Sequence, residues 1–363
     1  MPVPILLAAA LLVGCSSSDS SSPTTTLTIA TIATIATIAT SAVPAPSTST
    51  AAAETTAPTE ASSSTAETSS TTADTAPDTT AEPTAEPTAE ETTATSVAPE
   101  PPDPTRPYDV FVPTTYDAAT PLPLVILLHG YSATGVLQDA YFGLQPLAEE
   151  RGFLYVHPDG TKNAIGNQFW NATDACCGFG QSDVDDSVYL IDIVHQVEAD
   201  YSVDPKRVYF VGHSNGGFMS YRMACDHADE VAAIVSLAGA TFLDTSQCAP
   251  SEPVSVLEIH GTGDRTIPYD GGENLGHVFP SAPTTVATWA AYDGCEPTAV
   301  PSTEMLDLST QTDGDETSVQ TFGGCPTGTD VALWTIADGP HIPQLSPSFA
   351  PDVIDFLFDH PKP

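Results

Sequence analysis

The chain has 363 residues and a formal net charge of −39 at pH 7, with eight Lys and Arg against 47 Asp and Glu. Residues 105–363 hold all eight cationic side chains and 35 of the acidic ones, which leaves that part at −27. Because so acidic a surface repels nucleic acids and anionic membranes, both are excluded as partners of this region.

The first 15 residues, MPVPILLAAALLVGC, are apolar and end at small residues and a cysteine. This run has the length of a secretory leader and is too short to span a bilayer. Its end, LVGC, resembles the lipobox of bacterial lipoproteins, in which the cysteine becomes the lipidated first residue. We therefore expect a signal peptide over 1–15 and a lipid anchor on Cys15, with the protein outside the cell at a bacterial membrane. The positive segment usual in such leaders is missing, so an uncleaved apolar N-terminus is the alternative.

Residues 16–104 consist almost entirely of Ser, Thr, Ala, Pro and Glu and contain no aromatic side chain. Such a segment cannot bury enough apolar surface to offset the chain entropy lost on folding, so the composition predicts a disordered tether. The remaining residues, 105–363, are numerous enough for one domain with a large core.

Within residues 105–363, short apolar runs alternate with longer stretches whose apolar residues are spaced three and four apart. Uniformly apolar strands between amphipathic helices indicate an α/β fold with a mainly parallel sheet covered by helices on both faces. Ligands of such sheets bind beyond the carboxyl ends of the strands. The strand-like runs are LPLVILLHG, GFLYVHPDG, RVYFVGHS, VAAIVSLAG, VSVLEIHG and DVALWTIA, and the main helix-like stretches are DDSVYLIDIVHQVEADY and GGFMSYRMACDHAD.

A serine follows the third of these runs in the sequence Gly212-His213-Ser214-Asn215-Gly216. This G-x-S-x-G pattern between a buried strand and an amphipathic helix is typical of a strained turn that exposes a nucleophilic hydroxyl. The pattern predicts Ser214 as a nucleophile, and a simple tight turn is the alternative.

An acid and a base that could activate the serine follow later in the chain. Asp264 comes just after the run VSVLEI in a glycine-containing turn, and Asp270 on the same loop is the fallback. His341 follows the last run in another glycine turn, whereas His129 and His260 precede glycines at strand ends, where we expect them to shape loops. The chain order Ser, Asp, His is that of an α/β-hydrolase triad.

Acyl transfer also needs N–H donors for the oxyanion of the tetrahedral intermediate. We expect the backbone amide of Asn215, which follows the nucleophile, and that of Tyr131, in the loop after the first apolar run, to supply them. Trp170 and His213 are candidates for substrate binding. The Trp170 and Tyr131 rings could stack on an aromatic acid or a sugar, with packing in the core as the alternative.

Six cysteines remain beyond the leader, and an even number in an exported protein indicates disulfides. We expect Cys225 to pair with Cys248 and Cys295 with Cys325, because each pair brackets one local excursion of the chain. Cys176 and Cys177 would bond to each other or exchange partners with the second bridge. No Cys-x-x-Cys spacing indicates zinc, and the acidic residues at 183–186 fit a helix start without a metal, so we expect neither metal nor cofactor.

Several motifs taken together resemble one family over about residues 106–360. HGYSATG, PDGTKNAIGNQFWNATDACCG, GHSNGGFMSYRMAC and IHGTGDRTIPYDGG, with a late Gly-x-His, are similar to the secreted polyhydroxybutyrate depolymerase and feruloyl esterase group of α/β-hydrolases. The resemblance implies a serine esterase with Ser214, Asp264 and His341 as its triad. The chain departs from the family pattern at GPHIPQ and in having no recognisable C-terminal polymer-binding module.

The expected activity is hydrolysis of carboxylic esters through an acyl-enzyme, on hydroxyalkanoate oligomers or polyester, or on feruloyl or acetyl esters of polysaccharides. About a dozen residues separate SLAG from VSVLEIHG, too few for a large helical lid, which suits bulky or polymeric esters. We expect a monomer. An acyltransferase, a serine peptidase on the same fold, or a catalytically inert surface binding protein are the alternatives.

Overall fold

The computed structural model describes residues 103–179 and 182–363. The leader, its Cys15 and all but the last two residues of the expected tether lie outside the described residues, so those expectations remain predictions. Within the described residues, no helix is both long and apolar enough to cross a bilayer.

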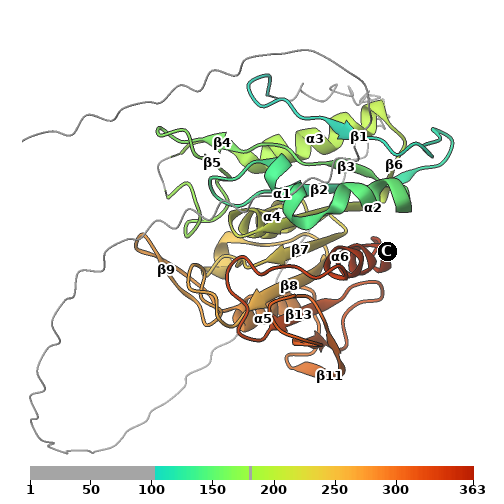
Figure 1. Cartoon of the computed structure of the whole chain (residues 1–363). Coiled ribbons are helices and arrows are strands. Elements are labelled where there is room, and N and C mark those ends of the chain that lie inside the picture. The colour runs from blue at the N-terminus through green and yellow to red at the C-terminus, as the bar shows by residue number, and fades with distance from the viewer. Residues whose placement is uncertain (1–102, 180–181) are drawn as a thin grey trace, which may run out of the picture. The chain divides into compact units, whose positions relative to one another are not determined.

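The described part of the chain is built around a nine-stranded sheet (Figure 1). Six strands run parallel in the order β3-β2-β6-β7-β8-β13, and they coincide with the six apolar runs predicted from the sequence. These strands are β2 (Leu122–Leu128), β3 (Leu154–Val156), β6 (Val203–His213), β7 (Ala233–Leu237), β8 (Ser255–Gly261) and β13 (Val331–Ile336). Antiparallel strands extend both edges, with β1 (Val110–Phe111) beside β3 and β12 (Thr317–Phe322) and β11 (Ala299–Leu306) beyond β13.

Helices cover both faces of the sheet, as the alternation of buried residues along β2 shows. Leu124 and Ile126 belong to one apolar cluster, whereas Val125 and Leu127 belong to a second, because successive side chains of a strand point to opposite faces. The first cluster includes side chains of α3 (Asp186–Asp200), α4 (Asn215–Asp226) and α5 (Ala282–Tyr292). The second includes side chains of α1 (Gly135–Phe142), α2 (Leu144–Arg151) and α6 (Phe349–Asp359). The predicted α/β fold is thereby confirmed.

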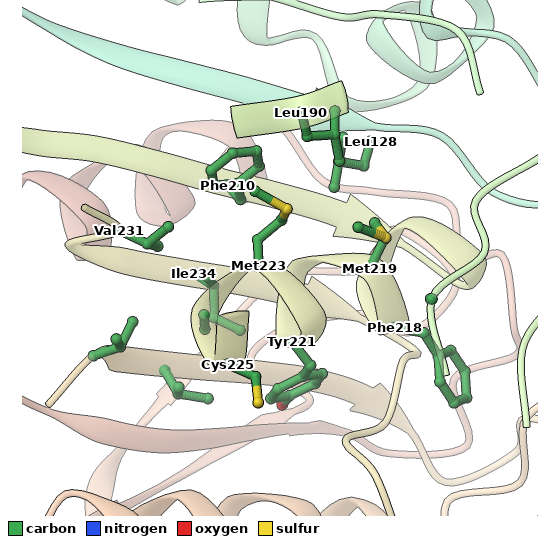
Figure 2. Packing of buried hydrophobic residues seen from close by; sticks show 14 of the residues in the cluster. Leu128, Leu190, Phe210, Phe218, Met219, Tyr221, Met223, Cys225, Val231 and Ile234 are labelled. Carbon is green, nitrogen blue, oxygen red and sulfur yellow. The ribbon is translucent and has the colours of Figure 1, made fainter. Parts of the chain in front are cut away.

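Figure 2 shows how α4 is fixed against the sheet. Met219 and Met223 point from the helix toward the side where Phe210 of β6 and Leu128 of β2 lie, and all four side chains are fully buried. Burying a side chain of this size contributes about 1.5–3 kcal/mol. The packing therefore holds the start of α4, and with it the turn that joins β6 to α4.

Two small hairpins and one short connection stand at the carboxyl edge of the sheet, and the sequence pattern did not predict the hairpins. They are β4–β5 (Thr161–Lys162 and Gln168–Phe169) and β9–β10 (Gly272–Asn274 and His277–Phe279). Their turns expose Ile165 by 81% and Leu275 by 74%. The segment between β7 and β8 contains only the 3-10 turn η1 (Thr245–Gln247), as expected for a fold without a large lid.

Three disulfides connect the six cysteines of the described residues. Cys225 pairs with Cys248 and Cys295 with Cys325, as predicted. Of the two alternatives for the adjacent cysteines, the structure has the bond between Cys176 and Cys177.

Candidate active site

Ser214 occupies the sharp turn between β6 and α4. Its backbone has φ 55° and ψ −119°, a conformation that is strained for a residue with a side chain. The turn is closed by glycines: a Cβ on Gly216 would lie 2.1 Å from the carbonyl oxygen of Leu128, and one on Gly212 would lie 2.1 Å from that of Gly216. Larger residues cannot replace them without moving the backbone, so the glycines of the motif are needed for the turn itself.

The structure brings Ser214, His341 and Asp264 into one hydrogen-bonded line. His341 Nε2 lies 2.9 Å from Ser214 Oγ, and His341 Nδ1 donates to Asp264 Oδ2 at 2.7 Å. Asp264 follows β8 and His341 follows β13, so three strand ends supply the three residues. The fallback, Asp270, is exposed on the same loop as Asp264.

Asp264 is held as an anion. Its Oδ1 accepts hydrogen bonds from the backbone amides of Thr266 and Ile267 at 2.7 and 2.9 Å. Burial alone would raise its pKa, but the neighbouring His260 ring and the hydrogen bond from His341 outweigh that and hold the pKa well below its usual range. The carboxylate therefore stays charged and can stabilise an imidazolium at His341.

Two backbone N–H groups beside Ser214 are free to bind an oxyanion. The loop of Gly130 and Tyr131 approaches the serine so closely that a Cβ on Gly130 would lie 3.5 Å from Ser214 Cβ. Neither the amide of Tyr131 nor that of Asn215 donates a hydrogen bond to any group in the described part of the chain. These are the two donors expected from the sequence.

Trp170 and His213 are buried beside the site, and the structure does not favour the prediction that they contact substrate. Trp170 is 0% exposed, and its Nε1 donates to the carbonyl of His129, so its ring is part of the core. Its backbone is bound by the side chain of Asn215 through two hydrogen bonds of 2.7 and 2.9 Å. His213 is buried and its Nε2 donates to the carbonyl of His341 at 2.9 Å.

A cavity of about 500 Å³ opens beside the predicted oxyanion donor Tyr131. Tyr131 is 42% exposed there, and its hydroxyl accepts a hydrogen bond from the side-chain amide of Asn163. The volume lies within the range of small-molecule sites. The apolar and aromatic side chains of its wall are Tyr131, Ala164, Phe169, Phe179, Val184 and Leu275, together with the disulfide-bonded Cys177. Polar side chains, among them Asn163 and Asp183, line the rest.

Two residues of β8 belong to the site although the sequence analysis expected one of them only to shape a loop. His260 Nε2 lies 3.5 Å from Asp264 Oδ2, and His260 Nδ1 lies 2.8 Å from Glu258 Oε1. The signal was available, because a glutamate and a histidine two positions apart share one face of an otherwise apolar strand.

The acidic residues at the start of α3 have structural partners. Asp185 caps the helix by accepting from the amides of Ser187 and Val188, and Asp186 forms a buried ion pair with Arg106. Within the described residues, no group of three or more His, Cys, Asp or Glu is placed to hold a metal ion.

Comparison with known proteins relates the chain to one family. The model of the phospholipase/carboxylesterase family matches residues 115–312. Feruloyl esterase B of Piromyces equi is 28% identical over 227 residues, which are 60% of this chain and 39% of that protein. A probable feruloyl esterase C of Aspergillus niger is 28% identical over 54% of this chain and 64% of its own length. The chain thus spans less than two thirds of these two relatives.

A further relative and one solved structure extend the comparison. A probable feruloyl esterase C of Aspergillus flavus is 32% identical over 229 residues, which cover 61% of this chain and 71% of that protein. The acetyl xylan esterase from Aspergillus awamori superposes with a TM-score of 0.50 at 16% identity, over 69% of this chain and 93% of that one. The likeness in structure supports a shared α/β-hydrolase fold.

Proposed function

Because the chain belongs to the phospholipase/carboxylesterase family and has the α/β-hydrolase fold, we propose that it is a serine hydrolase of carboxylic esters. The observation that carries the proposal is the unbroken line of hydrogen bonds from Ser214 through His341 to Asp264. A serine hydroxyl is a weak nucleophile at neutral pH, and this arrangement is one that activates it.

The geometry supports the following sequence of steps. His341 Nε2 takes the proton of Ser214 Oγ while that oxygen attacks the ester carbonyl, and the backbone amides of Tyr131 and Asn215 bind the oxyanion. The protonated His341 then gives its proton to the departing alcohol, which leaves an acyl-enzyme on Ser214. Water, deprotonated by His341, attacks that ester, and the acid leaves as the Ser214 hydroxyl is restored. Asp264 stabilises the imidazolium in both halves of the reaction.

We propose feruloyl or acetyl esters of polysaccharides as the substrate class, ahead of hydroxyalkanoate esters. Relatives named as feruloyl esterases support this choice, as does the cavity beside Tyr131, whose wall offers aromatic side chains to an aromatic acid. The short segment between β7 and β8 supports access for a bulky ester.

We further propose that the protein is exported and anchored through a lipid on Cys15. The leader-like sequence and the three disulfides support export, because such bonds persist in oxidising compartments. Metabolic labelling with palmitate should mark the wild-type protein, and Cys15→Ser should remove the label and release the protein from the membrane fraction. A label that survives in Cys15→Ser would contradict the anchor.

The activity is tested with the purified full chain on methyl ferulate and on a 3-hydroxybutyrate trimer side by side, with Ser214→Ala as the control. We expect release of ferulic acid that the mutation abolishes without changing the thermal unfolding midpoint. Release of 3-hydroxybutyrate alone would keep the esterase and overturn the substrate class. Failure to cleave either ester or to react with an organophosphonate probe would overturn the hydrolase assignment.

A further inference from the structure

A second chain of polar contacts reaches Asp264 from α4 and β8. Tyr221 of α4 donates its hydroxyl proton to Glu258 Oε2 at 2.9 Å, and Glu258 Oε1 lies 2.8 Å from His260 Nδ1. His260 Nε2 then lies 3.5 Å from Asp264 Oδ2, the same carboxylate oxygen that accepts from His341. The reaction steps proposed above do not use Tyr221, Glu258 or His260.

Each ring nitrogen of His260 faces an oxygen that can accept a hydrogen bond. Its Nε2 lies 2.8 Å from the carbonyl oxygen of Ile267, and a carbonyl can only accept, so Nε2 carries a hydrogen. Its Nδ1 faces the Glu258 carboxylate. The side chains of Glu258 and Asp264 are both 0% exposed. Burial raises the pKa of Glu258, and a cation between the two carboxyl groups is what favours the charged form of both.

An imidazolium at His260 is the group placed to be that cation. Burial alone would lower its pKa, but hydrogen bonds to Asp264 and Glu258 raise the pKa of His260 to about 10. The titratable side chains that face this cluster from the elements around it are Tyr221, Glu258, Asp264, Tyr269, His213 and His341. Of these, only Glu258 and Asp264 lie in direct polar contact with His260.

We propose that His260 is a positioning residue that, as an imidazolium between Glu258 and Asp264, keeps the Asp264 carboxylate charged and directed at His341 when the pH is mildly acidic. The proposal rests on the esterase function proposed above. A positive charge beside Asp264 favours the charged form of that carboxylate, which is the form that orients His341. Loss of the charge at His260 should therefore let Asp264 take up a proton at higher pH. Glu258, in turn, orients His260 and keeps it charged.

The test is the pH dependence of kcat/KM for the ester that the wild-type full chain cleaves. In His260→Gln, loss of the positive charge should move the acid limb to higher pH by about half a unit and lower kcat about tenfold, with KM nearly unchanged. In Glu258→Gln, His260 loses the carboxylate that keeps it charged, so the acid limb should move in the same direction as in His260→Gln but by less. His195→Gln is the matched control, because His195 forms a similar pair with Glu230 far from the triad, and its profile should equal that of the wild type.

A measurement without catalysis keeps the proposal testable if a variant fails to fold. In the ¹⁵N-histidine-labelled wild-type chain, one imidazole should keep both ring nitrogens protonated from pH 6 to pH 9, and the Ser214→Ala protein should show the same signal. Absence of such a histidine would overturn the proposal. An acid limb that is unchanged in His260→Gln, or that moves to lower pH in either variant, would also overturn it. An inactive wild type with the doubly protonated histidine would instead count against the esterase function alone.

Discussion

Ser214 and His341 face each other across 2.9 Å, yet the turn that carries the serine and the loop that carries the histidine are held in different ways. The turn is fixed by backbone packed against backbone at Gly212 and Gly216. The loop begins with a similar backbone contact, since a Cβ on Gly261 would lie 2.1 Å from the Gly339 carbonyl oxygen. Around His341 itself, it is held by single hydrogen bonds, from His213 Nε2 to the His341 carbonyl and from the Tyr141 hydroxyl to the Pro343 carbonyl at 2.7 Å.

Because the serine turn and the histidine loop are held differently, they should respond differently to substitutions. A side chain added at Gly212 or Gly216 would overlap backbone atoms that cannot move without disturbing their neighbours. Substitutions in the serine turn should therefore destabilise the whole fold. A loop held by separate hydrogen bonds can lose one and keep the others, so changes there should give graded losses of activity with little loss of stability.

The largest effect on activity is expected at Asp264, whose hydrogen bond holds His341. Asp264→Asn should lower kcat about 10⁴-fold, because an amide no longer holds His341 in the tautomer that accepts the serine proton. Steady-state kinetics at pH 7.5 measures this, and Asp270→Asn, an exposed change on the same loop, should retain full activity. Full activity of Asp264→Asn would remove Asp264 from the triad.

The next effect distinguishes the serine turn from the loop. Gly216→Ala should lower the free energy of unfolding by about 3 kcal/mol, because the added Cβ overlaps the Leu128 carbonyl in a packed region. Urea denaturation measures the change. Gly323→Ala is the control, since its Cβ would meet only the end of the Glu296 side chain at 3.3 Å. Equal stability of both variants would contradict the steric account of the turn.

A third effect depends on pH. Burial lowers the pKa of His213 to about 4, so between about pH 6.5 and pH 4 the unfolded chain binds a proton there that the folded chain does not. Stability should therefore fall as the pH drops through this window, by about 3 kcal/mol from His213 alone. In urea titrations from pH 7 to pH 4, His213→Gln should lose that much less than the wild type. Parallel curves for the two proteins would show that His213 titrates normally.

The smallest effect concerns the loop alone. Tyr141→Phe removes one hydrogen bond, worth about 1 kcal/mol, from the segment that carries His341 and should lower kcat/KM about fivefold. The unfolding midpoint should change by no more than in Tyr292→Phe, which loses a similar bond to the carbonyl of Thr245. If the two variants were equally active, the Tyr141 bond would have no part in placing the base.

The sequence predicted the parts of the fold whose cause is local. Each parallel strand has a stretch that is buried on both faces and reads as an apolar run, although Glu258 and His260 interrupt the run in β8. The edge strand Ala299–Leu306 was missed because it is mostly exposed and contains Pro301, and the hairpins were missed because strands of two or three residues carry no periodicity.

The residues of the candidate site also differ in whether their local sequence was enough to predict their roles. Ser214 stands in a motif, and Asp264 and His341 follow strand ends in the expected order, so each could be picked from its own neighbourhood. Trp170 could not, because its burial depends on hydrogen bonds with Asn215, 45 residues away. Whether an aromatic ring faces a cleft or the core is decided by such distant partners.

The distances along the chain between the three residues of the line also bear on how the protein folds. Ser214 and His341 are 127 residues apart, and Asp264 and His341 are 77 apart. Contacts between segments so far apart form late, because their loop-closure entropy must first be offset by other interactions. On refolding from urea, helix content should therefore return before ester cleavage does, and recovery of activity would time the docking of β13 onto β8.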